Sequence, residues 1–440
     1  ALEWQAFLSP EDGFSTNLLD NSLTELKELA ADVPYFDSAF QSSIQSATSI
    51  ADLQSLLNVD VTDQELALRG QDRRDYSMRP GQSKLRSGKF FANMEIPLSD
   101  NFSIYSFGGL SYRNGEAAGF YRRPAQSRAN TAVYINGFLP EIHTDVNDKS
   151  LAVGIKGKQG EWDIDFSNTW GRNSFDFTIN NSSNATLGTS TPLETYAGGF
   201  AFAQNTTNLD ISRFYDSVWS GLNVAFGAEY RLENYELLQG SEASWATYDV
   251  NGDIWNGDAS LAVTDFFGRQ RPGGIQVFPG FRPENERDAR RNSYALYADL
   301  EADITDRIFV GTALRFENYS DFGSTLNWKV SSLFKLNENF NLRAAASTGF
   351  RAPSLHQLHF NATSTNFVNG VPNEVGTFSN DSRIAKLLGI PELKEEESFS
   401  ASVGLAAKIP SANLTVTVDA FFTAIEDRTT LTGNFFRPDE

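Results

Sequence analysis

The sequence of 440 residues contains no cysteine, only three histidines, and no apolar run that approaches the roughly 18 residues of a membrane-spanning helix. Without cysteine there are no disulfides, no thiol catalysis and no cysteine-ligated metal site. The mean hydropathy is -0.35, which on its own would suggest a water-soluble chain. Basic residues are too few to balance the acidic ones, and the net charge of -20 argues against nucleic acid as a partner.

What the sequence does contain is a regular alternation of apolar and polar side chains. Leu414, Val416 and Val418, for example, alternate with Thr415 and Thr417. Side chains of a strand point to opposite faces with period two, so each such stretch predicts a β-strand with one apolar and one polar face, and charges fall on the polar face. The stretches predicted as strands are 85–97, 101–113, 148–158, 161–171, 199–214, 220–236, 292–304, 307–318, 325–336, 340–351, 397–409 and 413–427.

These stretches match the ten or so residues that a tilted strand needs to cross a bilayer. Short turns rich in Gly, Pro, Asn, Asp and Ser alternate along the chain with the long segments 114–147, 172–198, 238–290 and 352–396. Short turns at one end and long loops at the other are typical of outer-membrane barrels, with the long loops extracellular. A soluble β-sandwich would alternate equally well, but its strands are shorter and its loops lack this asymmetry.

The predicted fold class is therefore an all-β, antiparallel transmembrane barrel. Counting 2–8 as the end of a first strand, the chain holds about 12–13 strands of a larger barrel. Residues 1–84 are predicted to form that strand end and a large, partly helical extracellular loop, because Ser22 and Glu25 make a capping box before helical spacing of leucines. Residues 85–440 are predicted to form the incomplete barrel. No signal peptide is visible at Ala1, so we expect an interior piece of a longer, exported protein.

Several motifs give the chain a family resemblance. The segment GFRAPSL at 349–355 resembles the box at a strand end of TonB-dependent outer-membrane receptors. Similar matches are FENYSDFG at 316–323, AFGAEYRLE at 225–233 and YINGFLPEI at 134–142. The residues of the first box are Gly349, Phe350, Arg351, Ala352, Pro353, Ser354 and Leu355.

The resemblance implies a barrel of about 22 strands that is filled by a plug and driven by the TonB complex of the inner membrane. A total of about 20 or 24 strands would equally satisfy the even number that such barrels require. Neither a plug nor a TonB-contacting box is present in this sequence. The expected partners are outer-membrane lipid, the TonB complex and a small-molecule or oligosaccharide ligand, and no nucleic acid.

Candidate ligand-binding residues lie in the predicted loops. Two pairs of arginines stand close to aromatic residues there, as in sites that hold an anionic or sugar ligand, although solvated loop charge is the commoner explanation. All three histidines also lie in loops, where hydrogen-bonding rim residues are common. The candidates are Arg122, Arg123, Tyr134, His143, Arg269, Arg271, His356 and His359.

Two metal-related interpretations have weaker support. His356 and His359 follow the first box in a layout that resembles haem receptors of the family, but the second box reads Ile390-Pro391-Glu392-Leu393 and departs from that pattern. Residues 249–258 carry acidic residues at spacing similar to a calcium loop, with Ile254 where glycine is required. We therefore predict no resident metal and no cofactor.

No nucleophile, base and orienting group assemble in the sequence, and no glycine-rich phosphate loop precedes a helix. The prediction is a non-enzymatic receptor of the Gram-negative outer membrane that takes up a scarce ligand, such as a siderophore, a vitamin or a glycan fragment. The alternatives are a passive porin-like channel and a secreted β-rich binding or hydrolytic protein.

Overall fold

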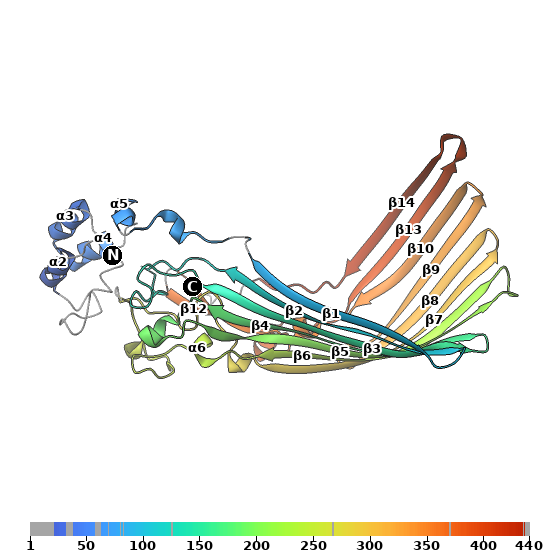
Figure 1. Cartoon of the computed structure of the whole chain (residues 1–440), viewed down its shortest axis with the longest axis horizontal. Helices are drawn as coiled ribbons and strands as arrows, with labels where there is room; N and C mark the ends of the chain where they lie inside the picture. The colour runs from blue at the N-terminus through green and yellow to red at the C-terminus, as the bar shows by residue number, and fades with distance from the viewer. Residues whose placement is uncertain are drawn as a thin grey trace.

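The computed structural model describes residues 22–31, 38–57, 63–68, 70–79, 81, 83–124, 126–265, 268–368, 371–433 and 435. The strand end expected at 2–8 lies outside these residues. The main element is one 12-stranded antiparallel sheet, in the order β1-β2-β3-β4-β5-β6-β7-β8-β9-β10-β13-β14. Figure 1 shows it as a long, curved and open sheet. The predicted antiparallel all-β fold is thereby confirmed.

Each of the 12 stretches predicted as full strands is present in the sheet. The strands are β1 (Lys84–Pro97), β2 (Phe102–Ala118), β3 (Glu141–Gln159), β4 (Trp162–Asn180), β5 (Thr195–Tyr215), β6 (Leu222–Leu238), β7 (Arg287–Thr305), β8 (Ile308–Tyr319), β9 (Gly323–Asn337), β10 (Phe340–Arg351), β13 (Glu396–Ile409) and β14 (Leu414–Glu426). A separate hairpin of β11 (Ala362–Val368) and β12 (Val371–Thr377) lies in the connection between β10 and β13 and was not predicted.

The strands extend further toward the long-loop end than the alternation suggested. In β3 and β4, pairing continues through Asn147–Ser174 and Asp145–Asp176, where both partners are polar. In this part of β4 the apolar side chains Phe175, Phe177 and Ile179 lie on the face opposite the one that carries Phe166 and Trp170, so backbone pairing continues although the apolar side of the strand has changed. The loops are correspondingly shorter, at 119–140, 181–194, 239–286 and 352–395.

One connection at the long-loop end is short, as the predicted strands 307–318 and 325–336 imply. At the long-loop end, β8 and β9 are joined only by residues 320–322. The aromatic ring of Phe322 stacks on Tyr319 with centroids 4.6 Å apart. Asp321 reaches Arg291 on the neighbouring β7 at 3.3 Å. These contacts hold the turn against the sheet.

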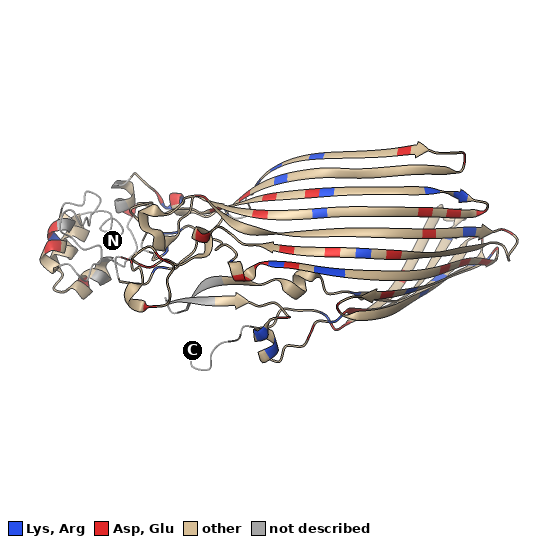
Figure 2. Ribbon diagram, turned by 90° about the horizontal axis from the view of Figure 1, so that it is seen from below, with Lys and Arg blue, Asp and Glu red and all other residues tan. Residues whose placement is uncertain are grey.

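The register gives the sheet two distinct faces. On one face, every strand of the sheet contributes at least one exposed apolar side chain. Figure 2 shows that charged residues recur along the strands. The apolar side chains of neighbouring strands therefore lie side by side and form a continuous band, as a lipid-facing surface requires. One such residue from each strand is Phe90, Leu110, Leu151, Phe166, Leu209, Phe226, Leu296, Leu314, Leu326, Leu342, Val403 and Val418.

Arg213 is an exception to the rule that charges lie on the polar face. It pairs in register with Val224 of the apolar phase, near the short-turn end. Its guanidinium lies 4.3 Å from the ring centre of Tyr215 and 5.6 Å from that of Trp162, and it forms an ion pair with Glu161. Aromatic and cationic side chains of this kind suit the membrane–water interface, where the charge reaches water.

A small helical unit precedes the sheet and lies at its long-loop end (Figure 1). It comprises α2 (Leu23–Ala31), α3 (Ser38–Ser46), α4 (Ile50–Leu57) and α5 (Asp63–Leu68), followed by the short η3 (Arg73–Tyr76). The predicted capping box is present, with Ser22 N donating to Glu25 Oε2 at 2.8 Å and Glu25 N donating to Ser22 Oγ at 3.2 Å. The buried residues of the unit are Leu26, Ile44, Ala47, Leu53 and Leu66.

The described connections between strands contain short helices. These are η4 (Ala185–Ser190), α6 (Glu242–Trp245), η5 (Ala259–Leu261), η6 (Pro283–Asn285), α7 (Leu355–His359), α8 (Arg383–Leu387) and η7 (Pro410–Ala412). No described helix has the length and apolar character needed to cross a membrane.

Adjacent residues of β7 test the assignment of the two faces. Leu300→Arg would place a guanidinium against lipid within the apolar band, and we expect it to lower the free energy of unfolding by about 2–4 kcal/mol. Glu301→Arg changes an exposed residue of the polar face and should alter stability by only about 0.5 kcal/mol. Urea unfolding of the full-length protein in lipid vesicles measures both values. Equal losses, or a larger loss for Glu301→Arg, would contradict the assigned faces.

Candidate functional site

Three of the long loops fold against one another at one end of the sheet, and we call residues 119–140, 181–194 and 239–286 the loop cap. Ser182 Oγ donates to the carbonyl of Gln276 at 2.8 Å. Asn184 Nδ2 donates to the carbonyls of Ala243 and Ala246 at 3.0 and 2.8 Å. Ser182 and Asn184 are fully buried. Because buried amides and hydroxyls are satisfied across loops, the cap is a packed structure.

Two of the predicted site residues hold this cap together. Arg271 Nη1 donates to the carbonyls of Ser127 and Ala129 at 3.1 and 2.7 Å, and Arg122 Nε donates to Gln276 Oε1 at 3.2 Å. Both arginines are buried, and desolvation lowers the pKa of Arg122 to about 10. Their guanidinium groups bridge the segments 119–140 and 239–286. Ligand contact by either arginine remains a prediction, and the burial of both side chains does not favour it.

The neighbouring candidates differ in exposure. Arg123 is exposed, and the structure gives its guanidinium no ion pair among the described residues. Arg269 is also accessible, but its side chain pairs with Asp265 at 2.6 Å. Tyr134 packs on Phe138 with ring centroids 4.7 Å apart. The nearby phenylalanines at 266 and 267 lie outside the described residues.

The acidic loop that suggested calcium is a self-contained turn. Asp249 is buried, and its Oδ1 accepts hydrogen bonds from the backbone N–H groups of Asn251 and Asp253 at 2.8 and 3.1 Å. A carboxylate used in this way stabilises a turn without any ion. Nothing in the loop brings further carboxylates to Asp249 within the described part of the chain.

His143 belongs to a charged network on the outer side of β2 and β3. Its Nε2 lies 3.2 Å from Glu141, and Glu116 is its direct cross-strand neighbour. These three side chains converge closely enough to hold a metal ion. Arg79 contacts both carboxylates, and Lys84 pairs with Glu116 at 2.7 Å. Two cations already neutralise the two carboxylates, so the group is an ion-pair network that ties residue 79 to the rim of the sheet.

The Arg-Ala-Pro box forms the turn from β10 into α7. Ser354 Oγ accepts a hydrogen bond from Gln357 N at 3.1 Å, and Gln357 Oε1 accepts one from Ser354 N at 2.9 Å, which is a capping box. Arg291, buried on β7, donates to the carbonyl of Pro353 at 2.7 Å and pairs with Glu233 at 2.8 Å. These hydrogen bonds and this ion pair attach the box to the polar face of the sheet.

Many of the side chains packed around α7 are aromatic. Tyr235, Leu237, Phe281 and Leu355 form a buried cluster. The ring of His356 lies 5.6 Å from Tyr235 and 5.0 Å from Phe360, measured between centroids. Further rings packed around the cluster are Phe177, Phe200, Phe202 and Phe278.

The second histidine of α7 points to a different partner. His359 Nδ1 lies 3.3 Å from Asp381 in the connection to β13. The two histidines therefore have separate neighbours, and the structure does not bring them together as a ligand pair. The haem interpretation gains no support from this arrangement.

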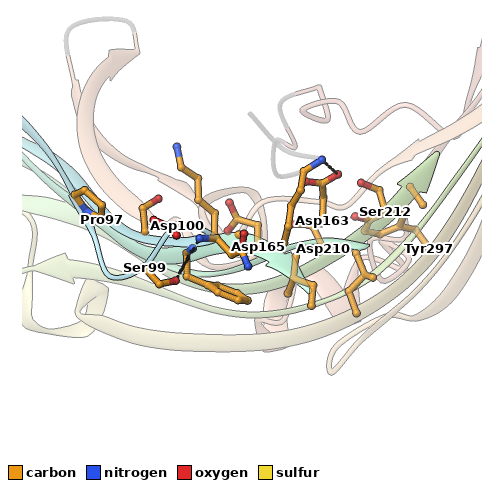
Figure 3. Close-up of a pocket in the computed structure, with 17 residues that line it drawn as sticks. Pro97, Ser99, Asp100, Asp163, Asp165, Asp210, Ser212 and Tyr297 are labelled. Carbon is orange, nitrogen blue, oxygen red and sulfur yellow. Dashed lines mark hydrogen bonds and ion pairs between the residues drawn. The ribbon is translucent and has the colours of Figure 1, made fainter. Parts of the chain in front are cut away.

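At the short-turn end, the polar face carries a hollow of about 720 Å³ (Figure 3). Asp163, Asp165, Asp210 and Ser212 line it from β4 and β5, and Tyr297 lines it from β7. Asp165 and Asp210 are direct cross-strand neighbours. Like charges in this position destabilise a sheet unless other groups compensate them.

Tyrosines from two strands away supply that compensation. Tyr105 of β2 crosses over Gly154 of β3, and its hydroxyl donates to the carboxylate of Asp165 at 2.8 Å. Tyr297 of β7 crosses over Gly227 of β6 in the same way and donates to Asp210. Each bridge passes over a glycine because a Cβ there would overlap the tyrosine ring.

A third bridge of this kind lies near the other edge of the sheet. Arg343 of β10 binds Asp419 of β14 across Gly404, with N–O distances of 2.7 to 3.0 Å. Sequence reasoning missed all three bridges, although each places a glycine on the polar phase of the middle strand. The carboxylates line an open wall together with Ser212 and Tyr297, and all of these groups can form hydrogen bonds with a polar partner.

Comparisons with known proteins agree with this architecture. The profile of a family described as TonB dependent receptor-like, beta-barrel, matches residues 90–438. The chain is 27% identical over 195 residues to the ferric enterobactin receptor PirA of Pseudomonas aeruginosa, a match that covers 42% of this chain and 25% of that protein.

Two solved structures share the fold at low sequence identity. The siderophore receptor PirA from Acinetobacter baumannii aligns with a TM-score of 0.52 at 12% identity, over 79% of this chain and 44% of that one. A variant of the ferric enterobactin receptor PfeA from Pseudomonas aeruginosa aligns with a TM-score of 0.53 at 13% identity, over 81% of this chain and 44% of that one. The chain thus spans less than half the length of each of these two structures.

The glycine bridges predict a stability difference between two Gly→Ala variants. In Gly154→Ala the new Cβ would lie 2.4 Å from Tyr105 Cζ, so we expect a loss of about 1–3 kcal/mol in the free energy of unfolding. Gly171→Ala on β4 is the control, because its Cβ would meet nothing closer than 3.7 Å. Urea unfolding of the full-length protein measures both. If Gly154→Ala costs as much in a Tyr105→Ala background as in the wild type, the bridge is not the cause.

Proposed function

The chain belongs to the TonB-dependent receptor-like β-barrel family, and on this premise we propose that it is the barrel portion of a receptor for active uptake of a scarce ligand. Members of the family are β-barrels of the Gram-negative outer membrane, which places the 12-stranded sheet in that membrane. The ligand would bind at the long-loop end, outside the cell. Energy would come from the TonB complex through a plug.

The observation that carries the proposal is the agreement between the family match and the two faces of the sheet. The match covers 90–438, and within that range every strand of the sheet places exposed apolar side chains on the same face. A barrel with this pattern faces lipid outside and a polar interior inside. The interior wall, with its carboxylates and tyrosine bridges, suits a polar plug that docks through hydrogen bonds.

We propose a siderophore as the ligand class. The relatives are named as receptors for siderophores or ferric enterobactin, which supports this class over a vitamin or a glycan fragment. Ferric siderophores are often anionic, and Arg123 offers an exposed guanidinium on the loop cap. We also propose that the receptor carries out no chemistry on its ligand, because the family it matches is one of transport receptors.

Uptake measurements distinguish active transport from a passive channel. We expect cells that express the full-length receptor to accumulate radio-iron from ferric enterobactin only while TonB is present and the proton gradient is intact. A porin-like channel would admit the ligand without TonB. The panel should also include a ferric hydroxamate, cobalamin and a maltodextrin. Energy-dependent uptake of cobalamin or the maltodextrin alone would overturn the siderophore assignment, and no energy-dependent uptake of any would overturn the proposal.

Two adjacent arginines provide a matched test of the binding surface. We expect Arg123→Gln to weaken binding of ferric enterobactin by about ten- to a hundredfold, since a hydrogen bond from a charged group contributes about 1.5–3 kcal/mol. Heat-modifiability on gels should show that this variant folds normally. Arg122→Gln should instead increase proteolysis of the loop cap, because it leaves buried Gln276 without its partner. Unchanged binding by Arg123→Gln would remove this residue from the site.

A further inference from the structure

Two copies of the tripeptide Asn-Gly-Asp lie close together in the loop cap, at 251–253 and 256–258. An asparagine followed by glycine is prone to spontaneous loss of its side-chain amide, because glycine has no Cβ to hinder attack by its own backbone nitrogen. The same pair occurs at 114–115 and 136–137, and also at 369–370, outside the described residues. The surroundings of the four described pairs decide which of them can react.

The reaction requires a free backbone nitrogen on the glycine. That nitrogen loses its proton and attacks Cγ of the asparagine, the new N–C bond closes a cyclic succinimide, and the side-chain nitrogen leaves as ammonia. Water then opens the ring at either of its carbonyl groups, which leaves aspartate or isoaspartate. A hydrogen bond from the glycine N–H to a carbonyl oxygen opposes the first step, because it holds the proton that has to leave.

Backbone hydrogen bonds or strand pairing restrain three of the described glycines. Gly115 lies within β2, where the backbone is paired with β1 on one side and β3 on the other. Gly137 N donates to the carbonyl of Tyr134 at 2.9 Å. Gly252 N donates to the carbonyl of Asp249 at 3.1 Å. Ring closure at these three pairs therefore has to disrupt the local fold first.

Gly257 differs from the other three glycines. Its backbone N–H has no hydrogen-bond partner within the described part of the chain. Residues 256–258 are exposed, and nothing lies within 4 Å of the position that a Cβ on Gly257 would take. Asn256 Oδ1 accepts a hydrogen bond from Asp258 N at 2.9 Å, which folds the asparagine side chain back over the glycine. The attacking nitrogen is thus free, and the group that it attacks is folded over it.

We propose that Asn256–Gly257 is a site of spontaneous deamidation in the folded receptor, whereas Asn251–Gly252 is protected. The two tripeptides are identical, both glycines have a positive φ, of 97° and 87°, and both have open space at the Cβ position. The pairs differ in the hydrogen bond that holds Gly252 N and in the one that folds the Asn256 side chain over Gly257. Both differences favour reaction at Asn256.

The modification changes both the charge and the backbone of the loop cap. Either product adds one negative charge beside Asp253 and Asp258. Isoaspartate also inserts a methylene group into the main chain between residues 256 and 257. The indole N–H of Trp255 donates to the carbonyl of Asp258 at 2.8 Å across this span, so a longer main chain separates the two groups. The modified turn is therefore looser and more open to proteases, which cut at exposed loop tips.

Peptide mapping of the full-length receptor in lipid vesicles tests the site. The folded protein is kept at mildly alkaline pH in heavy-oxygen water, and its peptides are analysed by mass spectrometry with electron-transfer fragmentation, which separates aspartate from isoaspartate. We expect Asn256 to lose its amide about fivefold faster than Asn251, with heavy oxygen and isoaspartate in the product. Equal rates, a faster Asn251, or aspartate without isoaspartate would overturn the proposal.

The unfolded protein is the matched control, because the two tripeptides are identical. In urea the hydrogen bonds of both turns are lost, so Asn251 and Asn256 should react at similar rates. If the faster reaction of Asn256 persisted unchanged in urea, the fold would not be its cause.

Two variants separate protection by the turn from the effect of the modification. Asp249→Ala removes the carboxylate that accepts from Asn251 N and Asp253 N, so Asn251 should then react nearly as fast as Asn256. In Asn256→Gln the side chain would have to close a larger ring, so ageing should no longer increase proteolysis at 255–258. Heat-modifiability on gels should show that both variants fold.

The opposite results would contradict the proposal. An unchanged rate at Asn251 in folded Asp249→Ala would show that the turn does not protect this residue. Proteolysis at 255–258 that rises on ageing in Asn256→Gln as much as in the wild type would show that deamidation does not open the turn. None of these results depends on which ligand the receptor takes up.

Discussion

The rest of the structure depends on the need to pair every backbone N–H and C=O group inside a bilayer. In an antiparallel ladder this pairing runs between neighbouring strands, and here it links β1 to β14 through 12 strands without a crossover. The ladder also sets the register, and register with period two decides which side chains meet lipid. The positions of the loops and of the tyrosine bridges follow from that register.

Much of the fold was predictable because lipid and water impose opposite demands on alternate residues. All 12 strands of the sheet, and the capping box at Ser22, were predicted from the sequence. The predicted strand bounds were wrong at the long-loop end, beyond the apolar band. Pairing between β3 and β4 continues beyond the apolar band to Glu141 and Asn180, well past the predicted bounds of 148–158 and 161–171. The hairpin of β11 and β12 carries no alternation strong enough to be found.

The candidate site was less predictable, because its geometry depends on contacts between distant segments. Arg122 and Arg123 are alike in sequence, yet Arg122 is buried against Gln276 from another loop and Arg123 is exposed. The bridge from Tyr105 over Gly154 to Asp165 requires the register of three strands at once. The sequence identifies these residue types and their faces, but tertiary packing decides which of them can meet a ligand.

The central claim, that one face of the sheet meets lipid, can be measured directly on β8. A nitroxide placed in turn at each position from 308 to 319 of the full-length receptor in membranes reports collisions with oxygen, which concentrates in lipid, and with a water-soluble nickel chelate. We expect oxygen accessibility to peak at residues 308, 310, 312, 314 and 316, with minima at the residues between them. A profile without this period, or one with its maxima at the odd-numbered residues, would contradict the membrane assignment of the sheet.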